Sequence, residues 1–132
     1  MGLMGSDLAM RHLKVAAIIL FALLPVRLAG QDVTPQMVAL GDSIFKGKVG
    51  GGTCIACHQA TAKGIPGLAP DLTDKTWLHS DGSLAAIIST IEKGVPKPKQ
   101  AAAPMLPKGG ASLTSDQIKA VAAYVYSLSH KQ

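Results

Sequence analysis

Three segments of the chain carry apolar residues at the three- and four-residue spacing of an amphipathic helix. The first segment begins at Thr34-Pro35, where threonine is a good N-cap and proline a good first helical residue, and it ends near Gly47. Glycine within a helix costs about 1 kcal/mol relative to alanine, so Gly41 predicts a close crossing with another helix. The apolar stripe of this segment consists of Met37, Leu40, Gly41, Ile44 and Phe45.

The other two helical patterns lie in the second half of the chain. One follows Asp81-Gly82-Ser83 and ends at Gly94, and the other begins with the capping box of Thr114 and Gln117. Their apolar stripes consist of Leu84, Ile87, Ile88 and Ile91 in one case, and of Ile118, Val121, Ala122, Val125 and Leu128, bordered by Tyr124, in the other. We expect an all-α fold in which the first and last helices cross.

Between the helices, the sequence Cys54-Ile55-Ala56-Cys57-His58 has the C-x-x-C-H pattern that attaches c-type haem. Two thiols on one turn of chain can add to the two vinyl groups of one haem, and the histidine can then bind its iron. A structural zinc site would need a second ligand pair, but the chain has only two cysteines. A disulfide between them would close a loop too short to stabilise much.

A dithiol redox centre is the alternative interpretation of the two cysteines. Such centres also use C-x-x-C, but a strand precedes the motif and a helix begins inside it. Here Gly50-Gly51-Gly52 precede the motif instead. We therefore favour haem attachment and keep thiol redox chemistry as the alternative.

Further candidates for the haem site lie in two proline-containing loops. Met105 is flanked by prolines and can present its thioether on the side opposite His58, although filling a gap in the core is its alternative role. The Pro70 carbonyl is the candidate acceptor for the second ring N–H of His58, with Leu72 packing on the haem; a plain surface turn is the alternative. His79 has no metal-binding spacing around it, so we expect an ordinary surface residue, with iron binding as the alternative.

The first thirty residues differ in character from the rest. A basic stretch precedes the twelve-residue apolar run 15–26, and small residues near Gly30 suit cleavage, which is typical of a secretory signal peptide. The run is shorter than the roughly twenty residues of a transmembrane helix. We therefore expect residues 1–30 to be removed on export and residues 31–132 to form the domain; Met10 is an alternative start, and an uncleaved anchor the alternative outcome. The basic residues are Arg11, His12 and Lys14.

Charge and aromatic content give information on the binding partners and on the core of the domain. Residues 31–132 contain ten lysines, no arginine and seven acidic residues, a formal charge of 10 − 7 = +3. This modest charge gives no reason to expect nucleic-acid binding, which requires a clustered basic face. The same segment has only four aromatic side chains and hence a thin core, so we expect it to fold poorly without a haem at its centre.

Residues 31–132 as a whole resemble the class I monohaem cytochromes c, above all bacterial periplasmic carriers and the cytochrome domains appended to dehydrogenases and oxidases. The resemblance implies three main helices with loops wrapped around one haem c, attached covalently through Cys54 and Cys57 and ligated axially by His58 and Met105. The nine positions from Phe45 to Cys54 exceed the usual link of that family, so a contact of Phe45 with the haem is not assumed. The matching features are Gly41 and Phe45, the C-x-x-C-H motif, Pro70 and Leu72, Met105, and Tyr124.

The resemblance implies a periplasmic electron-transfer protein that carries one electron at a time and is not an enzyme. We expect a monomer without a stable membrane anchor, whose partner is a redox protein: a dehydrogenase, an oxidase or a membrane complex. One alternative is a cytochrome subunit bound permanently to a dehydrogenase or terminal oxidase, which would not purify alone. The other is a haem sensor or peroxidase-like enzyme with a labile methionine, whose iron would bind carbon monoxide or cyanide readily.

Overall fold

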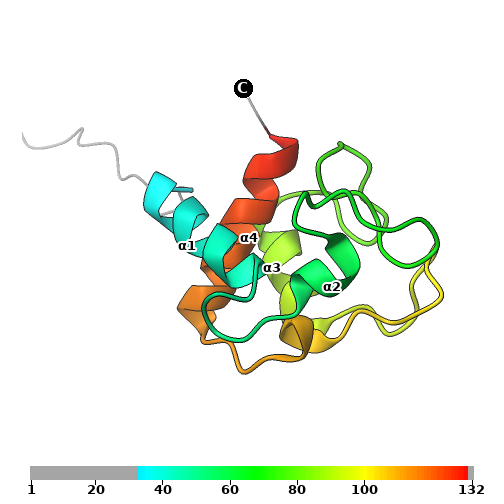
Figure 1. Ribbon diagram of the computed structural model, residues 1–132. Coiled ribbons are helices and arrows are strands. Elements are labelled where there is room, and N and C mark those ends of the chain that lie inside the picture. The colour runs from blue at the N-terminus through cyan, green and yellow to red at the C-terminus, as the bar shows by residue number, and fades with distance from the viewer. Residues whose placement is uncertain (1–32, 131–132) are drawn as a thin grey trace, which may run out of the picture. The chain divides into compact units, whose positions relative to one another are not determined.

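The computed structural model describes residues 33–130, which form helices joined by long loops (Figure 1). Within this range there is no named strand, only two isolated antiparallel bridges, Ile65 with Ala69 and Val95 with Met105. The predicted all-α class is therefore confirmed. The elements are α1 (Pro35–Phe45), α2 (Cys54–His58), α3 (Leu84–Lys93), the 3₁₀ helix η1 (Pro107–Gly110) and α4 (Ser115–Ser129).

The three long helices begin and end where their capping residues predict. The Thr34 side chain accepts a hydrogen bond from the Met37 N–H at 3.2 Å at the start of α1. Ser83 caps α3, which ends at Gly94, and Thr114 and Gln117 form the expected capping box of α4. Local sequence thus fixes the helix ends, as capping chemistry requires.

Helices α1 and α4 cross closely, as Gly41 predicts, and lie side by side in Figure 1. A β-carbon at Gly41 would overlap the backbone carbonyl of Ala120 and would lie 2.7 Å from the β-carbon of Tyr124. One turn further along α1, the Phe45 ring packs at 5.3 Å, centroid to centroid, from the Tyr124 ring. The absent side chain of Gly41 is therefore what lets the two backbones approach.

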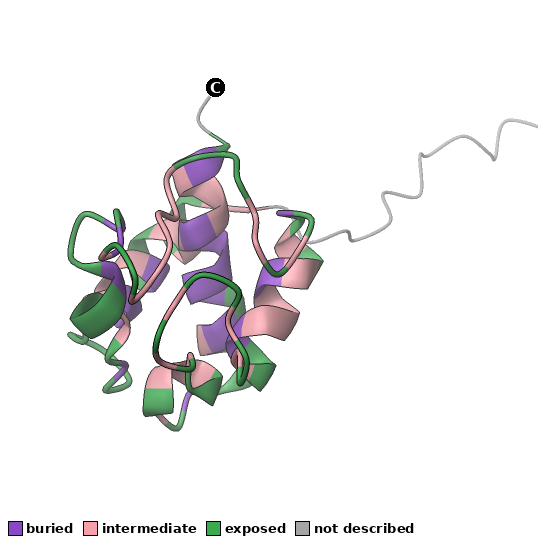
Figure 2. Cartoon of the chain, turned by 90° about the vertical axis from the view of Figure 1, so that its right-hand side faces the viewer, coloured by how far each residue is buried: buried purple, intermediate pink, exposed green. Residues whose placement is uncertain are grey.

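The buried residues gather on the inner faces of the helices, as Figure 2 shows. On α1 they are Gly41, Ile44 and Phe45, but Leu40 is 42% exposed, so its predicted place in the buried stripe is wrong. The apolar stripe in the sequence is thus broader than the part of α1 that becomes buried. Leu128 of α4 is likewise only half-buried.

Two short elements were not expected from the sequence. The motif itself forms the one-turn helix α2, which the sequence analysis did not predict. No strand precedes α2 in residues 33–130, and the preceding glycines form turns instead. The 3₁₀ helix η1 follows Met105 and contains left-handed backbone at Lys108 and Gly109.

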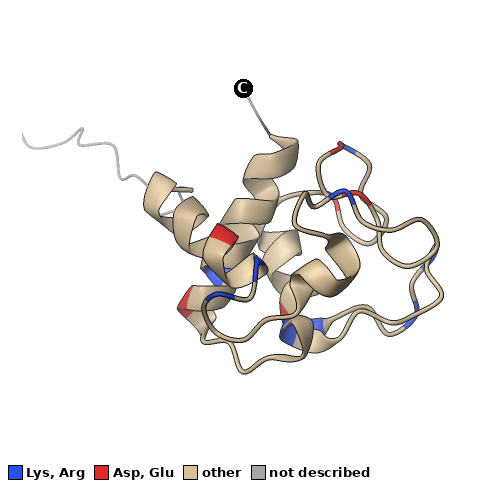
Figure 3. Ribbon diagram, viewed as in Figure 1, with Lys and Arg blue, Asp and Glu red and all other residues tan. Residues whose placement is uncertain are grey.

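Charged side chains are spread over loops and helices rather than gathered in one place (Figure 3). The ion pairs of the described residues are local, and all involve at least partly exposed side chains, so each contributes little to stability. No helix within residues 33–130 has both the length and the apolar character needed to cross a bilayer. The predicted signal peptide, residues 1–30, lies outside the described residues.

Candidate functional site

A cavity of about 470 Å³ lies among α2, α3, α4 and the two proline-containing loops. Its volume falls in the range of about 300–1,000 Å³ that is typical of small-molecule sites. All six residues predicted for the haem site line it: Cys54, Cys57, His58, Pro70, Leu72 and Met105. Much of the remaining wall is apolar and includes Phe45, Trp77, Ile87, Ile91 and Val125.

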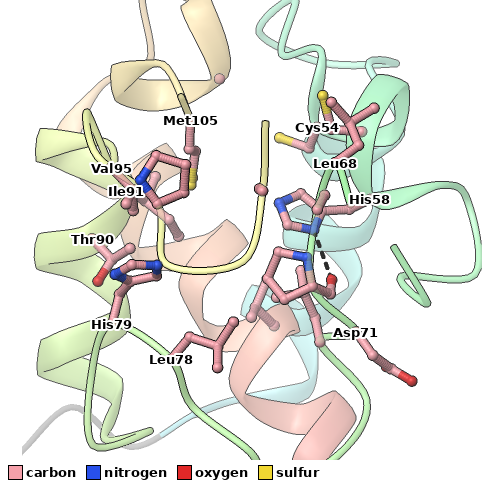
Figure 4. A pocket seen from close by; sticks show the side chains of 18 of the residues that line it. Cys54, His58, Leu68, Asp71, Leu78, His79, Thr90, Ile91, Val95 and Met105 are labelled. Atoms are coloured by element: carbon pink, nitrogen blue, oxygen red, sulfur yellow. Dashed lines mark hydrogen bonds between the residues drawn. The ribbon is translucent and has the colours of Figure 1, made fainter. Parts of the chain in front are cut away.

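His58 and Met105 lie on opposite walls of this cavity, and their side chains point into it (Figure 4). Cys54 lies on the same side as His58, since both belong to the single turn of α2. Cys57 completes the edge of the cavity. The structure thus brings together two thiols, an imidazole and a thioether around one apolar space.

The His58 ring is held by the backbone of the Pro70 loop. Its Nδ1 lies 3.3 Å from the Pro70 carbonyl oxygen, the contact that the sequence predicts. Because a carbonyl can only accept, Nδ1 donates and the neutral ring keeps Nε2 free for the cavity. Burial lowers the pKa of His58, while the Pro70 contact opposes that shift. The imidazole is therefore neutral and oriented, as a metal ligand must be.

Gly64 explains why the Pro70 carbonyl reaches the histidine. A β-carbon at Gly64 would overlap the carbonyl groups of Ala69 and Pro70, so only glycine lets the loop fold back this tightly. The Gly64 N–H donates to the His58 carbonyl at 3.0 Å, and the Leu72 N–H donates to the Ala62 carbonyl at 2.9 Å. The loop is thus fastened on both sides of Pro70.

The opposite wall is fastened to α3 and to the start of α2. Val95, which follows α3, exchanges two backbone hydrogen bonds with Met105, at 2.9 and 3.1 Å. Within η1, the Gly109 carbonyl accepts a hydrogen bond from the Thr53 hydroxyl at 2.7 Å. Met105 therefore lies in a segment held at both ends, which the flanking prolines alone do not reveal.

Residues 96–104 connect the two walls along the rim of the cavity. The Ala102 N–H donates to the Gly67 carbonyl at 2.8 Å, which joins this connection to the Pro70 loop. Several of its side chains line the cavity, among them Pro98, Ala101 and Pro104. The connection thus forms part of the cavity wall.

The state of the cysteines argues against the thiol redox alternative. Burial raises the pKa of the Cys54 thiol, whereas a redox-active cysteine needs a lowered pKa to form its thiolate. Among the described residues there is also no group of three or more histidine, cysteine, aspartate or glutamate side chains suited to a metal ion. A site built from thiols and acids alone is therefore not supported.

His79 is exposed, in agreement with the expectation of a surface residue. Its Nε2 accepts a hydrogen bond from the Lys99 N–H at 3.2 Å, so this nitrogen is engaged with the 96–104 connection. The ring nevertheless borders the cavity next to Thr90, on the side of α3 and Met105 (Figure 4). Of the histidines in residues 33–130, His79 and His58 are those that line the cavity, so His79 is the histidine that could replace Met105.

The residues present fit a haem c. A flat apolar group with an iron at its centre requires an apolar slot with one ligand on each face, and His58 and Met105 face such a slot from opposite walls, where they would hold the iron. Two thiols at one edge suit covalent attachment. In residues 33–130 no buried side-chain nitrogen or oxygen lacks a hydrogen-bond partner, so the cavity makes no demand for a polar ligand.

Sequence reasoning missed several residues of the site. Phe45 is 1% exposed and lines the cavity 6.3 Å from the His58 ring, centroid to centroid, despite the long link to Cys54. Trp77 also lines the cavity and packs against Gly82, where a β-carbon would overlap the indole. The one signal that could have found it is that Trp77 is the only tryptophan of the chain.

The Asp71 carboxylate makes the stability of the fold depend on pH. It accepts hydrogen bonds from the Thr73 N–H and hydroxyl at 2.7 Å each and pairs with Lys63 at 3.2 Å; these contacts, those of Thr73 foremost, lower the pKa of Asp71. A lowered native pKa stabilises the fold above the unfolded value of about 3.9, and this gain is lost as pH falls through the native pKa.

Asp71→Ala is therefore expected to lower the free energy of unfolding by about 1 kcal/mol near neutral pH, the usual net contribution of such hydrogen bonds. The difference from the wild type should stay constant down to about pH 5 and shrink below about pH 4. Urea unfolding of both proteins across this range measures it. A difference that persists unchanged in strong acid would show that the charge of Asp71 has no part in it.

Comparison with known proteins agrees with this geometry. The family model described as cytochrome c matches residues 38–129. The chain is 39% identical over 88 residues to a cbb3-type cytochrome c oxidase subunit FixP of Bradyrhizobium sp. (strain ORS 278), covering 66% of this chain and 28% of that protein. It is 35% identical over 108 residues to a cbb3-type cytochrome c oxidase subunit CcoP of Rhodobacter capsulatus, covering 78% and 33% respectively.

Among solved structures, the chain resembles cytochrome CL from the marine methylotroph Methylophaga aminisulfidivorans, with a TM-score of 0.54 and 24% identity. The match covers 72% of this chain and 55% of that one, and it supports the fold alone. The chain spans about a third or less of the length of these two curated relatives.

Proposed function

Since the chain belongs to the cytochrome c family, we propose that it carries one electron at a time on a single haem c in the cavity between His58 and Met105. The observation that carries this proposal is the facing imidazole and thioether with two thiols at one edge. A bound haem c supplies an iron that alternates between the ferric and ferrous states. The rest of the chemistry belongs to the side chains around it.

Each side chain has a distinct role in this proposal. Cys54 and Cys57 would hold the haem through thioether bonds, each S–H adding across one vinyl double bond, so attachment would consume no oxidant. His58 binds through Nε2 while the Pro70 carbonyl holds its other nitrogen, and Leu72 packs beside the ring system. The neutral thioether of Met105 favours ferrous iron and so raises the reduction potential.

With a protein ligand on each face of the haem, no open position remains for a substrate on the metal. The walls of the same space are largely apolar. The domain therefore passes electrons to and from a redox partner protein and catalyses no reaction of its own. We place this function in the periplasm, with residues 1–30 as the export signal and residues 31–132 as a monomeric domain without a membrane anchor.

A second candidate is a cytochrome subunit held permanently in an oxidase complex. The observation that favours it is that the relatives matching this chain are named as subunits of cbb3-type oxidases. The two candidates differ in where the protein is found after gentle lysis of cells. A free carrier separates from membranes and elutes alone from a sizing column, whereas a subunit stays with a larger complex.

The covalent attachment can be tested directly. The wild-type protein should keep a haem-stained band on a denaturing gel, and Cys54→Ser/Cys57→Ser should lose it completely, because no thioether can form. Each single variant should retain some stain, since one link is enough to hold the group. A wild-type band without stain, or with two free thiols, would refute the proposal and return the thiol redox alternative to first place.

A further inference from the structure

Met105 needs help from its surroundings to act as a ligand. Methionine has three rotatable side-chain bonds and adapts readily to different environments, so its side chain does not fix the position of its own sulfur. What the protein can fix is the backbone from which the thioether extends. The contacts of residues 94, 95 and 105–109 show how this is done.

The end of α3 and the Met105 segment lie against each other without any space between them. A β-carbon at Gly94 would overlap the Met105 carbonyl and would lie 2.7 Å from the Pro107 nitrogen and 2.9 Å from the Leu106 carbonyl carbon. Separations below 3.0 Å essentially never occur for real β-carbons. All three atoms belong to the backbone, so no side chain can swing aside to make room.

The same contact sets the hydrogen bonds between the two segments. Gly94 has φ +67° and ψ −170°, a backbone conformation that residues other than glycine rarely adopt. It turns the chain so that Val95 faces Met105. Val95 then donates to and accepts from Met105, which fixes the backbone of the methionine in both directions. The far end of the segment is fixed by the hydrogen bond from Thr53 to Gly109.

We propose that Gly94 is a positioning residue for Met105: it lets the methionine backbone lie directly on the end of α3, and Thr53 holds the far end of the same segment. This inference rests on the proposed function, because it concerns how the thioether is presented to a haem iron. Any side chain at residue 94 pushes Met105 away from the cavity. The sixth position on the iron should then open for part of the time.

The test places alanine at two glycines that both have a positive φ. Only at Gly94 does the added carbon also collide with another segment. Gly94→Ala has both a positive φ and the collision with Met105. Gly51→Ala also places alanine at a positive φ, of +68°, but no atom lies within 4 Å of the added carbon, so it lacks the collision. Both are made in the full chain and checked for covalent haem on a denaturing gel, which separates a failure of the proposed function from a failure of this inference.

The readout is the binding of added imidazole to the ferric protein, followed by absorption spectroscopy, together with the reduction potential. Gly94→Ala should bind imidazole about tenfold more tightly than the wild type, because affinity rises with the fraction of molecules in which methionine is displaced. Its potential should fall. Gly51→Ala should resemble the wild type in both measurements, and equal behaviour of the two variants would overturn the proposal.

Thr53→Val provides a second measurement in case Gly94→Ala does not accumulate. It removes the hydroxyl that holds Gly109 while keeping the shape of the side chain, and it should tighten imidazole binding by a smaller factor. The control is Thr61→Val, because the exposed Thr61 side chain makes no hydrogen bond among residues 33–130. If the wild type, Thr53→Val and Thr61→Val bound imidazole with the same affinity, the proposal that Thr53 holds the far end of the Met105 segment would be wrong.

Discussion

Replacing Met105 with alanine is expected to leave the haem attached but to open the position on the iron opposite His58. The alanine side chain is too short to reach across the cavity, so added imidazole or cyanide should bind readily. The reduction potential should fall by on the order of 0.1 V or more, within the range of about 0.8 V that axial ligands span, because a thioether favours ferrous iron. Absorption spectra and potentiometry measure both effects.

Two further variants complete this experiment. Met105→His should keep six ligands on the iron but lower the potential, since imidazole stabilises ferric iron better than a thioether does. Met37→Leu, at the other methionine of residues 31–132, should change neither quantity because Met37 lies on α1 and does not line the cavity. If Met105→Ala kept the wild-type spectrum and potential, another residue would have to be the ligand, and His79 would be mutated next.

Alanine at Gly41 is expected to destabilise the fold, although alanine at an ordinary helical position stabilises by about 1 kcal/mol relative to glycine. The added carbon would collide with the backbone of Ala120 on α4, so the two helices must move apart. Overpacking of this kind costs about 1–3 kcal/mol, and Gly41→Val should exceed that range because its two further methyl groups also enter α4. Against a total of about 5–15 kcal/mol, Gly41→Val should remove a large share of the free energy of unfolding.

Urea unfolding of the haem-loaded protein measures these changes. Ala39→Gly is the matched control, because Ala39 lies on the exposed face of the same helix. It should destabilise by about 1 kcal/mol through helix propensity alone. If Gly41→Ala proved more stable than the wild type, the close approach of α1 and α4 would not be what Gly41 provides.

The sequence was a good guide to the long helices because their ends are set by local chemistry. Thr34, Ser83 and Thr114 each cap the helix that follows them, and glycine ends α3, all within a few residues of chain. Helix faces were harder to predict, as Leu40 shows, because the pattern marks a broad apolar stripe while the partner helix covers only part of it. The five residues of α2 are too few to display any period.

The site was predictable where its chemistry follows from residue types at a fixed spacing. The motif and Met105 carry such chemistry, and the contact of His58 with Pro70 follows from the needs of a bound histidine. The supports of the site could not be found this way. Thr53 and Gly109 are 56 positions apart and meet through a backbone carbonyl, which leaves no side-chain pattern in the sequence. Gly94 reads as a helix stop, and its contact with Met105 exists only in three dimensions.

The position of His58 and Met105 on facing walls also affects the conformational entropy of the unfolded chain. His58 and Met105 are 47 positions apart (105 − 58), and an iron bound to both would close a loop of that length, much as a disulfide does. Loop-closure entropy assigns about 4 kcal/mol to a cross-link of this size. Because the thioether binds ferrous iron more firmly than ferric iron, the cross-link is stronger in the reduced protein. Reduction of the haem should therefore also raise the resistance of the protein to unfolding.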